Sequence, residues 1–225
     1  MRWLRVGGAL LLAVPVQAGS GDHRRAGRML SEWRIDDARK LIAELATSEP
    51  KRAETRYLQA ELAFLEGKYQ KAQSHLDGLK DQQVGKSVGR LRQLIAGTMT
   101  ATRGFASRRS AKGHFEIFYQ PGKDEVIVDI AADALDKAYE AFGRDLGIKP
   151  KGPIRVELLT KPADLAKVST LTEKDIRTTG TIALCKYNKL MAVTPRATLF
   201  GYAWLDTLAH EYVHYLVSTA TRDRV

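Results

Sequence analysis

A histidine–glutamate–x–x–histidine pattern stands near the carboxy end of the chain, formed by His210, Glu211 and His214. In a helix, residues four apart lie about 40° from each other on one face, so both imidazoles can bind one ion. Neutral imidazoles suit zinc, at Zn–N distances of about 2.0–2.1 Å. Glu211 lies about 100° around the helix from His210, where it can take a proton from a metal-bound water. The spacing therefore predicts a zinc centre with two histidine ligands and a catalytic carboxylate.

The pattern lies within residues 201–221, whose length and apolar spacing predict a helix. Chance alone would give about 0.006 such matches in a chain with this histidine and glutamate content. The apolar side chains fall on the arc opposite the histidines and are expected to anchor the helix in the core: Leu205, Leu208, Ala209, Tyr212, Tyr215 and Leu216. The alternative is a helix with two hydrogen-bonded histidines and a surface glutamate.

A catalytic zinc ion takes three protein ligands and a water, so a third ligand is required. The metzincin pattern would place glycine at 217 and histidine at 220, and Val217 and Ala220 exclude that family. Asp206 lies one turn before His210, but about 12 Å of helix axis separates it from His214, too far to share one ion with both histidines. We expect Asp206 either to hydrogen-bond a ligand histidine or to cap the helix.

The segment 204–217, with the predicted strand pair before it, resembles the gluzincin metallopeptidases, in particular bacterial peptidase MA-like domains attached to tetratricopeptide repeats. The resemblance covers about residues 113–225 and is specific mainly in the last helix. It implies His210 and His214 as ligands of a Zn²⁺ cofactor and Glu211 as the catalytic base. The function it implies is hydrolysis of peptide bonds by a metal-activated water.

The same resemblance implies two further features. The third zinc ligand of that family is a glutamate of a Glu-Gly pair on a following helix, and the sequence stops at Val225 before any such residue. We therefore expect either a truncated reading of a longer enzyme or a chain that has lost catalysis. The family's edge strand, which pairs with an extended substrate, corresponds to residues 180–185.

The carboxy-terminal half alternates strand-like and helix-like segments, which predicts a mixed sheet with helices and an α+β fold. The predicted strands are 114–120, 153–160, 180–185 and 190–193, and the predicted helices are 126–146, 162–171 and 201–221. Cys185 is the only cysteine, which excludes an internal disulfide framework and any multi-cysteine metal site. It is expected to be a small buried strand residue and not a nucleophile.

Residues 19–104 are predicted to form helical hairpins with a period of 34 residues. Small and large residues recur at that shift, with Ala26 matching Ala60 and Ala38 matching Ala72. A segment including Ala60, Gly67-Lys68-Tyr69 and Ala72 resembles a tetratricopeptide repeat, which implies binding of peptides or partner proteins. The alternative is a plain helical hairpin packed on the next domain. Residues 113–225 form the second predicted unit, similar to a zincin domain and incomplete at its carboxy end.

The first 18 residues have the pattern of a secretory signal peptide: Arg2 and Arg5, an apolar core over 6–16 and a small residue at Ala18. We therefore expect an exported protein, periplasmic or secreted. No apolar run reaches the roughly 20 residues that a membrane-spanning helix requires, which excludes a polytopic membrane protein.

The net charge of +10 is concentrated in the first half, where residues 1–112 hold 21 lysines and arginines against 11 acidic residues. Residues 105–112 are predicted to be a linker. Weak contact with an anionic cell envelope is one hypothesis for this excess, a solvated set of helix faces is the plainer one, and no nucleic acid partner is expected.

Two functions remain in competition on the sequence. The leading hypothesis is an exported zinc-dependent metallopeptidase acting on a peptide or protein substrate, with a partner protein on its helical repeats. The rival is a non-catalytic peptide- or protein-binding scaffold of the cell envelope. Zinc binding by His210 and His214 separates the two.

Overall fold

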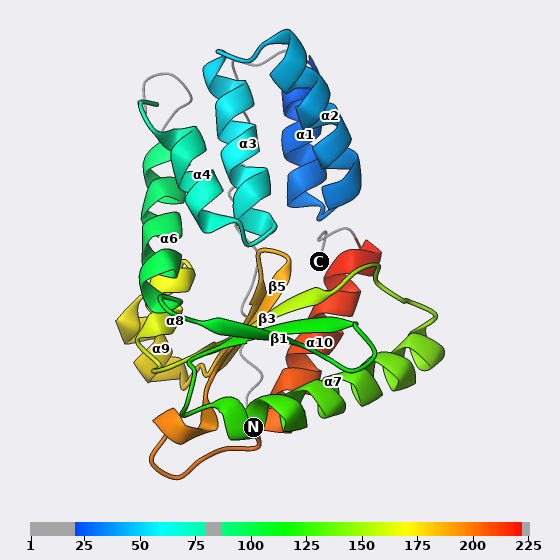
Figure 1. Cartoon of the computed structure of the whole chain (residues 1–225), viewed down its shortest axis with the longest axis vertical. Helices are drawn as coiled ribbons and strands as arrows, with labels where there is room; N and C mark the ends of the chain where they lie inside the picture. The colour runs from blue at the N-terminus through cyan, green and yellow to red at the C-terminus, as the bar shows by residue number, and fades with distance from the viewer. Residues whose placement is uncertain (1–20, 80–86, 222–225) are drawn as a thin grey trace.

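The computed structural model describes residues 21–79 and 87–221. Within these ranges the chain is α+β, with nine α-helices and one five-stranded mixed sheet, as the sequence predicts for the fold class. Figure 1 shows a helical layer at one end and the sheet at the other, with helices on both faces of the sheet. The predicted signal peptide, residues 1–18, lies outside the described residues. None of the described helices has the length and apolar character needed to cross a membrane.

The helical layer consists of α1 (Gly21–Ser31), α2 (Ile35–Ser48), α3 (Ala53–Leu65), α4 (Tyr69–Leu76) and α6 (Ser87–Ala101). The small residues that recur every 34 positions, Ala26, Ala38, Ala60 and Ala72, have no exposed surface. A methyl side chain lets two helix backbones approach closely, while the larger apolar residues beside it fill the remaining space. The repeated alanines therefore mark the helix contacts of the hairpins.

The sheet has the strand order β1-β2-β3-β5-β4. Its strands are β1 (Ala106–Arg109), β2 (Phe115–Tyr119), β3 (Ile154–Leu159), β4 (Ala183–Lys186) and β5 (Lys189–Val193). The three central strands run parallel, and the two edge strands run antiparallel to their neighbours. β3 and β5 are buried along most of their length, as expected for strands covered on both faces.

One face of the sheet packs on α7 (Glu125–Leu146) and α10 (Trp204–Thr221) through a single apolar cluster. The other face packs on the helical layer, α8 (Asp164–Val168) and α9 (Glu173–Thr179) through a second cluster. The helical layer thus shares its core with the sheet, and Figure 1 shows α6 reaching down to α8.

β4 and β5 form the predicted hairpin, with a two-residue turn at Tyr187 and Asn188. Both turn residues are left-handed, with φ of 56° and 59°. This conformation matches the twist of a tight hairpin, and asparagine tolerates it better than most residues. β4 is consequently held at the edge of the sheet, beside α10.

Two boundaries differ from the sequence prediction. Residues 106–109 of the expected linker form β1, which pairs antiparallel with β2, so this part of the linker prediction is wrong. The strand accommodates basic side chains because Arg109 is exposed and the half-buried Arg108 forms an ion pair with Asp129. The predicted short helix 162–171 is present as α8, and a further helix that was not predicted, α9, follows it because Thr172 caps it by bonding reciprocally with Asp175.

Candidate metal centre

The two histidines of the motif converge on the exposed face of α10. The Nε2 atoms of His210 and His214 lie 3.0 Å apart, and the ring centroids are 4.6 Å apart with an interplanar angle of 83°. At that separation the Nε2–H of one ring donates to the unprotonated Nε2 of the other. At least one of the two imidazoles is therefore neutral. The sequence prediction that one helical turn brings the two imidazoles together is confirmed.

The opposite face of α10 anchors the helix. Leu208, Tyr212, Tyr215 and Leu216 are buried, while Leu205 and Ala209 are half-buried. Tyr212 packs edge-on against Phe115 of β2, with ring centroids 5.2 Å apart. Because these contacts fix the rotation of α10 about its axis, they also fix the direction in which the histidines point.

Glu211 is buried and not a surface carboxylate, since only 9% of it is exposed. Burial raises the pKa of Glu211 to about 7. A hydrogen bond from the Cys185 main-chain N–H lowers the pKa, but this effect is smaller than that of burial. A carboxylate whose pKa lies near neutral pH is well matched to proton transfer as a general base. The alternative prediction of a surface glutamate is therefore wrong, whereas its two hydrogen-bonded histidines are present in the structure.

Electrostatics favour a neutral imidazole at His214. Partial burial and the neighbouring His210 both lower the pKa of His214 below its ordinary value. Neutral imidazole is the form that binds metals, so no proton has to be displaced near neutral pH. The other three histidines of the described ranges lie on other elements: His23 hydrogen-bonds Thr55, His114 stacks on Tyr139, and His75 is in the last turn of α4.

The pair fits one zinc ion. Two nitrogens bound tetrahedrally at about 2.0–2.1 Å are about 3.3 Å apart, so a shift of a few tenths of an ångström from the observed 3.0 Å suffices. The described residues contain no group of three histidine, cysteine, aspartate or glutamate side chains that could hold a metal. They therefore supply two ligands, and the third predicted ligand is not among them.

Asp206 takes neither of its two expected roles within the described structure. It lies exposed in the first turn of α10, and no side-chain hydrogen bond joins it to His210 or to the helix end. Its carboxylate still lies near the amino end of the helix, where a negative charge interacts favourably with the helix dipole.

The contact between Glu211 and Cys185 is a site feature that the sequence did not reveal. Cys185 is half-buried in β4, close to the small strand residue that we expected. Alternate residues of an edge strand point their main-chain groups away from the sheet. The Val193 N–H bonds to the Ile182 carbonyl at 2.8 Å, so this alternation turns the Cys185 main chain to the open side, toward α10.

No family model matches the chain, and neither a curated protein nor a solved structure matches it.

Proposed function

We propose that the chain is a zinc-dependent metallopeptidase similar to the gluzincins, with a zincin-like sheet and an active-site helix, α10. The observation that carries the proposal is the convergence of the His210 and His214 Nε2 atoms, 3.0 Å apart, on the helix that also holds the buried Glu211. Two histidines without a metal role gain little from facing each other in solvent. A buried carboxylate of raised pKa on the same helix, one residue after His210, is typical of a functional site.

In this proposal His210 and His214 hold the ion through Nε2, and bound zinc supplies a water of lowered pKa and an electrophile for a peptide carbonyl. Glu211 accepts the proton of the attacking water and passes it to the leaving amine. The Cys185 N–H orients one carboxylate oxygen, which leaves the other free for the proton. The exposed face of α10 gives an extended chain access from solvent.

The proposal also includes export of the protein, and binding of a partner or substrate by the helical layer. The third ligand implied by the resemblance is a glutamate on a helix after α10, and residues 222–225 contain no glutamate. One observation favours the rival function, a non-catalytic scaffold: the described residues offer two metal ligands and not three. The two functions make different predictions for metal content.

The first experiment measures zinc after equilibrium dialysis of the purified chain and of His210→Ala. We expect the variant to lose at least about tenfold in zinc affinity, because a single imidazole remains. His75→Ala on α4 is the matched control and is expected to bind zinc like the unaltered chain. Equal zinc content in the chain and in His210→Ala would contradict the metal centre.

The second experiment separates metal binding from catalysis. Glu211→Gln keeps the size of the side chain and an acceptor for the Cys185 N–H but cannot take a proton. We expect zinc content to be unchanged and the rate of peptide cleavage to fall by about 10²–10⁴, the range for loss of a general base. Full activity in this variant, measured with a fluorogenic peptide mixture, would exclude Glu211 as the base.

A further inference from the structure

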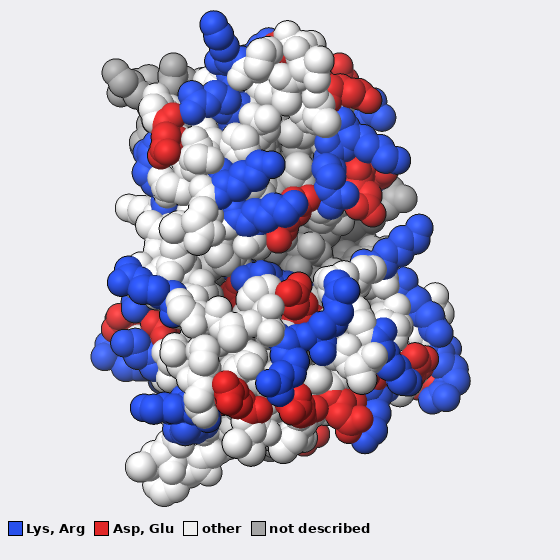
Figure 2. All heavy atoms as spheres, viewed as in Figure 1, with Lys and Arg blue, Asp and Glu red and all other residues white. Residues whose placement is uncertain are grey.

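A cleft of about 740 Å³ lies between the helical layer and the sheet, one turn of α10 beyond the histidines. Its helical wall comes from the turns around α2 and α3–α4. Its other wall comes from the loop before β3, the hairpin turn and the end of α10. Figure 2 shows the molecule hollowed here, with basic and acidic side chains on both sides of the hollow. His210, Glu211 and His214 do not line the cleft, so it is separate from the proposed metal centre.

Two contacts connect the metal centre to this cleft. At the first, the Cys185 main chain meets Glu211, and at the second, the hydroxyl of Tyr215 donates to Asn188 at 2.9 Å. From the first contact to the second, the hairpin goes from Cys185 to Asn188 and α10 goes from Glu211 to Tyr215. Both segments therefore run in the same direction, toward the cleft. Four helical residues span about 6 Å, the length of about two extended residues. A polypeptide lying along β4 thus enters the cleft about two residues from Glu211.

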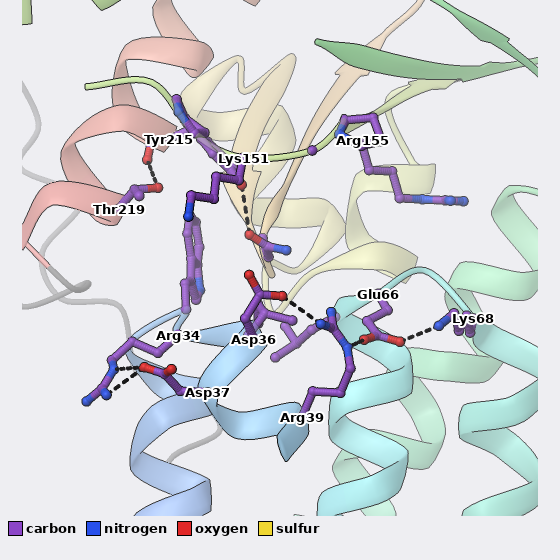
Figure 3. Close-up of a pocket in the computed structure, with 17 residues that line it drawn as sticks. Arg34, Asp36, Asp37, Arg39, Glu66, Lys68, Lys151, Arg155, Tyr215 and Thr219 are labelled. Atoms are coloured by element: carbon purple, nitrogen blue, oxygen red, sulfur yellow. Dashed lines mark hydrogen bonds and ion pairs between the residues drawn. The ribbon is translucent and has the colours of Figure 1, made fainter. Parts of the chain in front are cut away.

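The cleft wall is polar and mostly neutralised by its own ion pairs. Arg34 binds Asp37, and Arg39 binds both Asp36 and Glu66, each at 2.6 Å. Figure 3 shows these pairs along the helical wall. When a peptide covers such a wall, each charge keeps its ion-pair partner, so no unpaired charge becomes buried.

The lining carries five cations and three carboxylates, so an excess of positive charge remains. Lys68 is paired with Glu66, and Arg155 with the buried Glu157. Lys151 is exposed and makes no ion pair with a described residue. In Figure 3 it points from the loop before β3 toward the helical wall. The unneutralised charge of the cleft is therefore concentrated at Lys151.

Trp33 ties the two walls together. It lines the cleft from the α1–α2 turn, and its ring lies 5.6 Å from that of Tyr215 on α10. Its φ is 52°, an unfavourable backbone conformation for a bulky residue, and its buried indole N–H has no acceptor within the described structure. Strain and an unmet donor at a cleft wall are features of a ligand-binding surface.

We propose that this cleft binds an acidic polypeptide, with a carboxylate side chain at Lys151 and the chain continuing along β4 to Glu211. The cleft would then select substrates by acidic residues two or more positions from the cleaved bond. This inference rests on the proposed function for the position of the cleaved bond, while binding in the cleft itself needs no zinc. The two ideas can therefore fail separately.

The test measures binding of fluorescein-labelled ten-residue peptides by anisotropy to the His210→Ala/His214→Ala chain, which cannot hold zinc through this pair. One peptide carries glutamate at alternate positions and the other carries glutamine there. We expect the glutamate peptide to bind about tenfold more tightly, with a preference that weakens as salt is added. Lys151→Glu should remove the preference, because it reverses the only unpaired charge among the described lining residues.

Lys161→Glu is the matched control, since Lys161 is an exposed lysine after β3 that does not line the cleft. It should change the affinity less than about twofold. Equal binding of the two peptides, or equal losses in Lys151→Glu and Lys161→Glu, would overturn the cleft proposal. If His210→Ala and Glu211→Gln contradict the peptidase but Lys151→Glu still removes the preference for the glutamate peptide, the cleft proposal is supported and the peptidase proposal is rejected.

Discussion

At the residue scale, the proposed centre depends on how a few side chains of α10 are held. Glu211 is fixed by the main chain of β4, and Tyr215, one turn later, is fixed by Asn188 in the hairpin turn. Asn188 serves two purposes there, since it accepts the tyrosine hydroxyl and also adopts a left-handed conformation with φ of 59°. A substitution at this turn should therefore change how firmly α10 is held against the hairpin.

Substitutions at Asn188 separate these two purposes. Asn188→Gly loses the hydrogen bond but suits the left-handed backbone, and should cost about 1 kcal/mol of unfolding free energy. Asn188→Ala loses the hydrogen bond and also replaces asparagine by a residue that tolerates the left-handed conformation less well, and should cost about 1 kcal/mol more than Asn188→Gly. Urea unfolding measures both, with Tyr215→Phe as the control that removes only the hydroxyl. Equal stability of the glycine and alanine variants would show that the backbone term is absent.

At the element scale, periodicity predicted the long segments well. α7 and α10 have a regular apolar face, β2 and β3 are bounded by proline or glycine, and their bounds agree with prediction to within a few residues. β1 was missed because a strand of sequence Ala-Ser-Arg-Arg has no apolar alternation and forms only through pairing with β2. The joining of β4 to Glu211 was missed for a similar reason, since it is a contact between distant segments.

Helix packing also depends on features that propensity does not reveal. Gly97 in α6 is a poor helix former, yet a Cβ at this position would lie 2.3 Å from the Lys167 carbonyl of α8. The absent side chain is what lets α6 approach α8. Gly27 in α1 is different, because a Cβ there would meet only the Leu58 side chain at an ordinary 3.8 Å.

Alanine at these two glycines should therefore have opposite effects. Gly27→Ala is expected to stabilise the protein by about 0.5–1 kcal/mol, the usual gain of alanine over glycine inside a helix. Gly97→Ala should destabilise it by about 1–3 kcal/mol, since the α6–α8 contact has to open against a backbone atom. Thermal unfolding followed by circular dichroism compares them directly. A stabilised Gly97→Ala variant would show that α8 moves away without cost.

At the scale of the whole molecule, the orientation of the helical layer on the sheet decides whether the cleft has two fixed walls. A buried polar cluster lies at that junction, where Lys189 of β5 donates to Glu157 of β3 at 2.8 Å and to the Tyr69 hydroxyl of α4 at 2.7 Å. Tyr69 also donates to Glu157. The sequence suggested two units with different charge. It gave no sign that Tyr69 of the helical layer hydrogen-bonds a buried ion pair of the sheet, because the three residues lie far apart in the chain.

Burial disfavours the charged form of Glu157, but Lys189 and Arg155 outweigh that effect and lower its pKa. A carboxyl whose pKa is lower in the folded than in the unfolded protein stabilises the fold above its unfolded pKa, near 4.5. That contribution is lost as the pH falls through the lower, folded value. We therefore expect the junction to weaken in acid, below about pH 4.5.

Breaking this pair should be more harmful than replacing it. Lys189→Met alone leaves the buried Glu157 with Arg155 as its remaining cation and should cost about 3–5 kcal/mol. Adding Glu157→Leu should recover part of that loss, because the half-buried Arg155 then lacks its carboxylate. The double variant should also lose less stability than the unaltered chain between pH 5 and pH 3. Urea unfolding at several pH values measures these differences. Arg108→Met is the control, because its pair with Asp129 is exposed and worth little. If the double variant is as unstable as Lys189→Met, or as sensitive to acid as the unaltered chain, the ion pair beneath Tyr69 does not stabilise the junction as its contacts indicate.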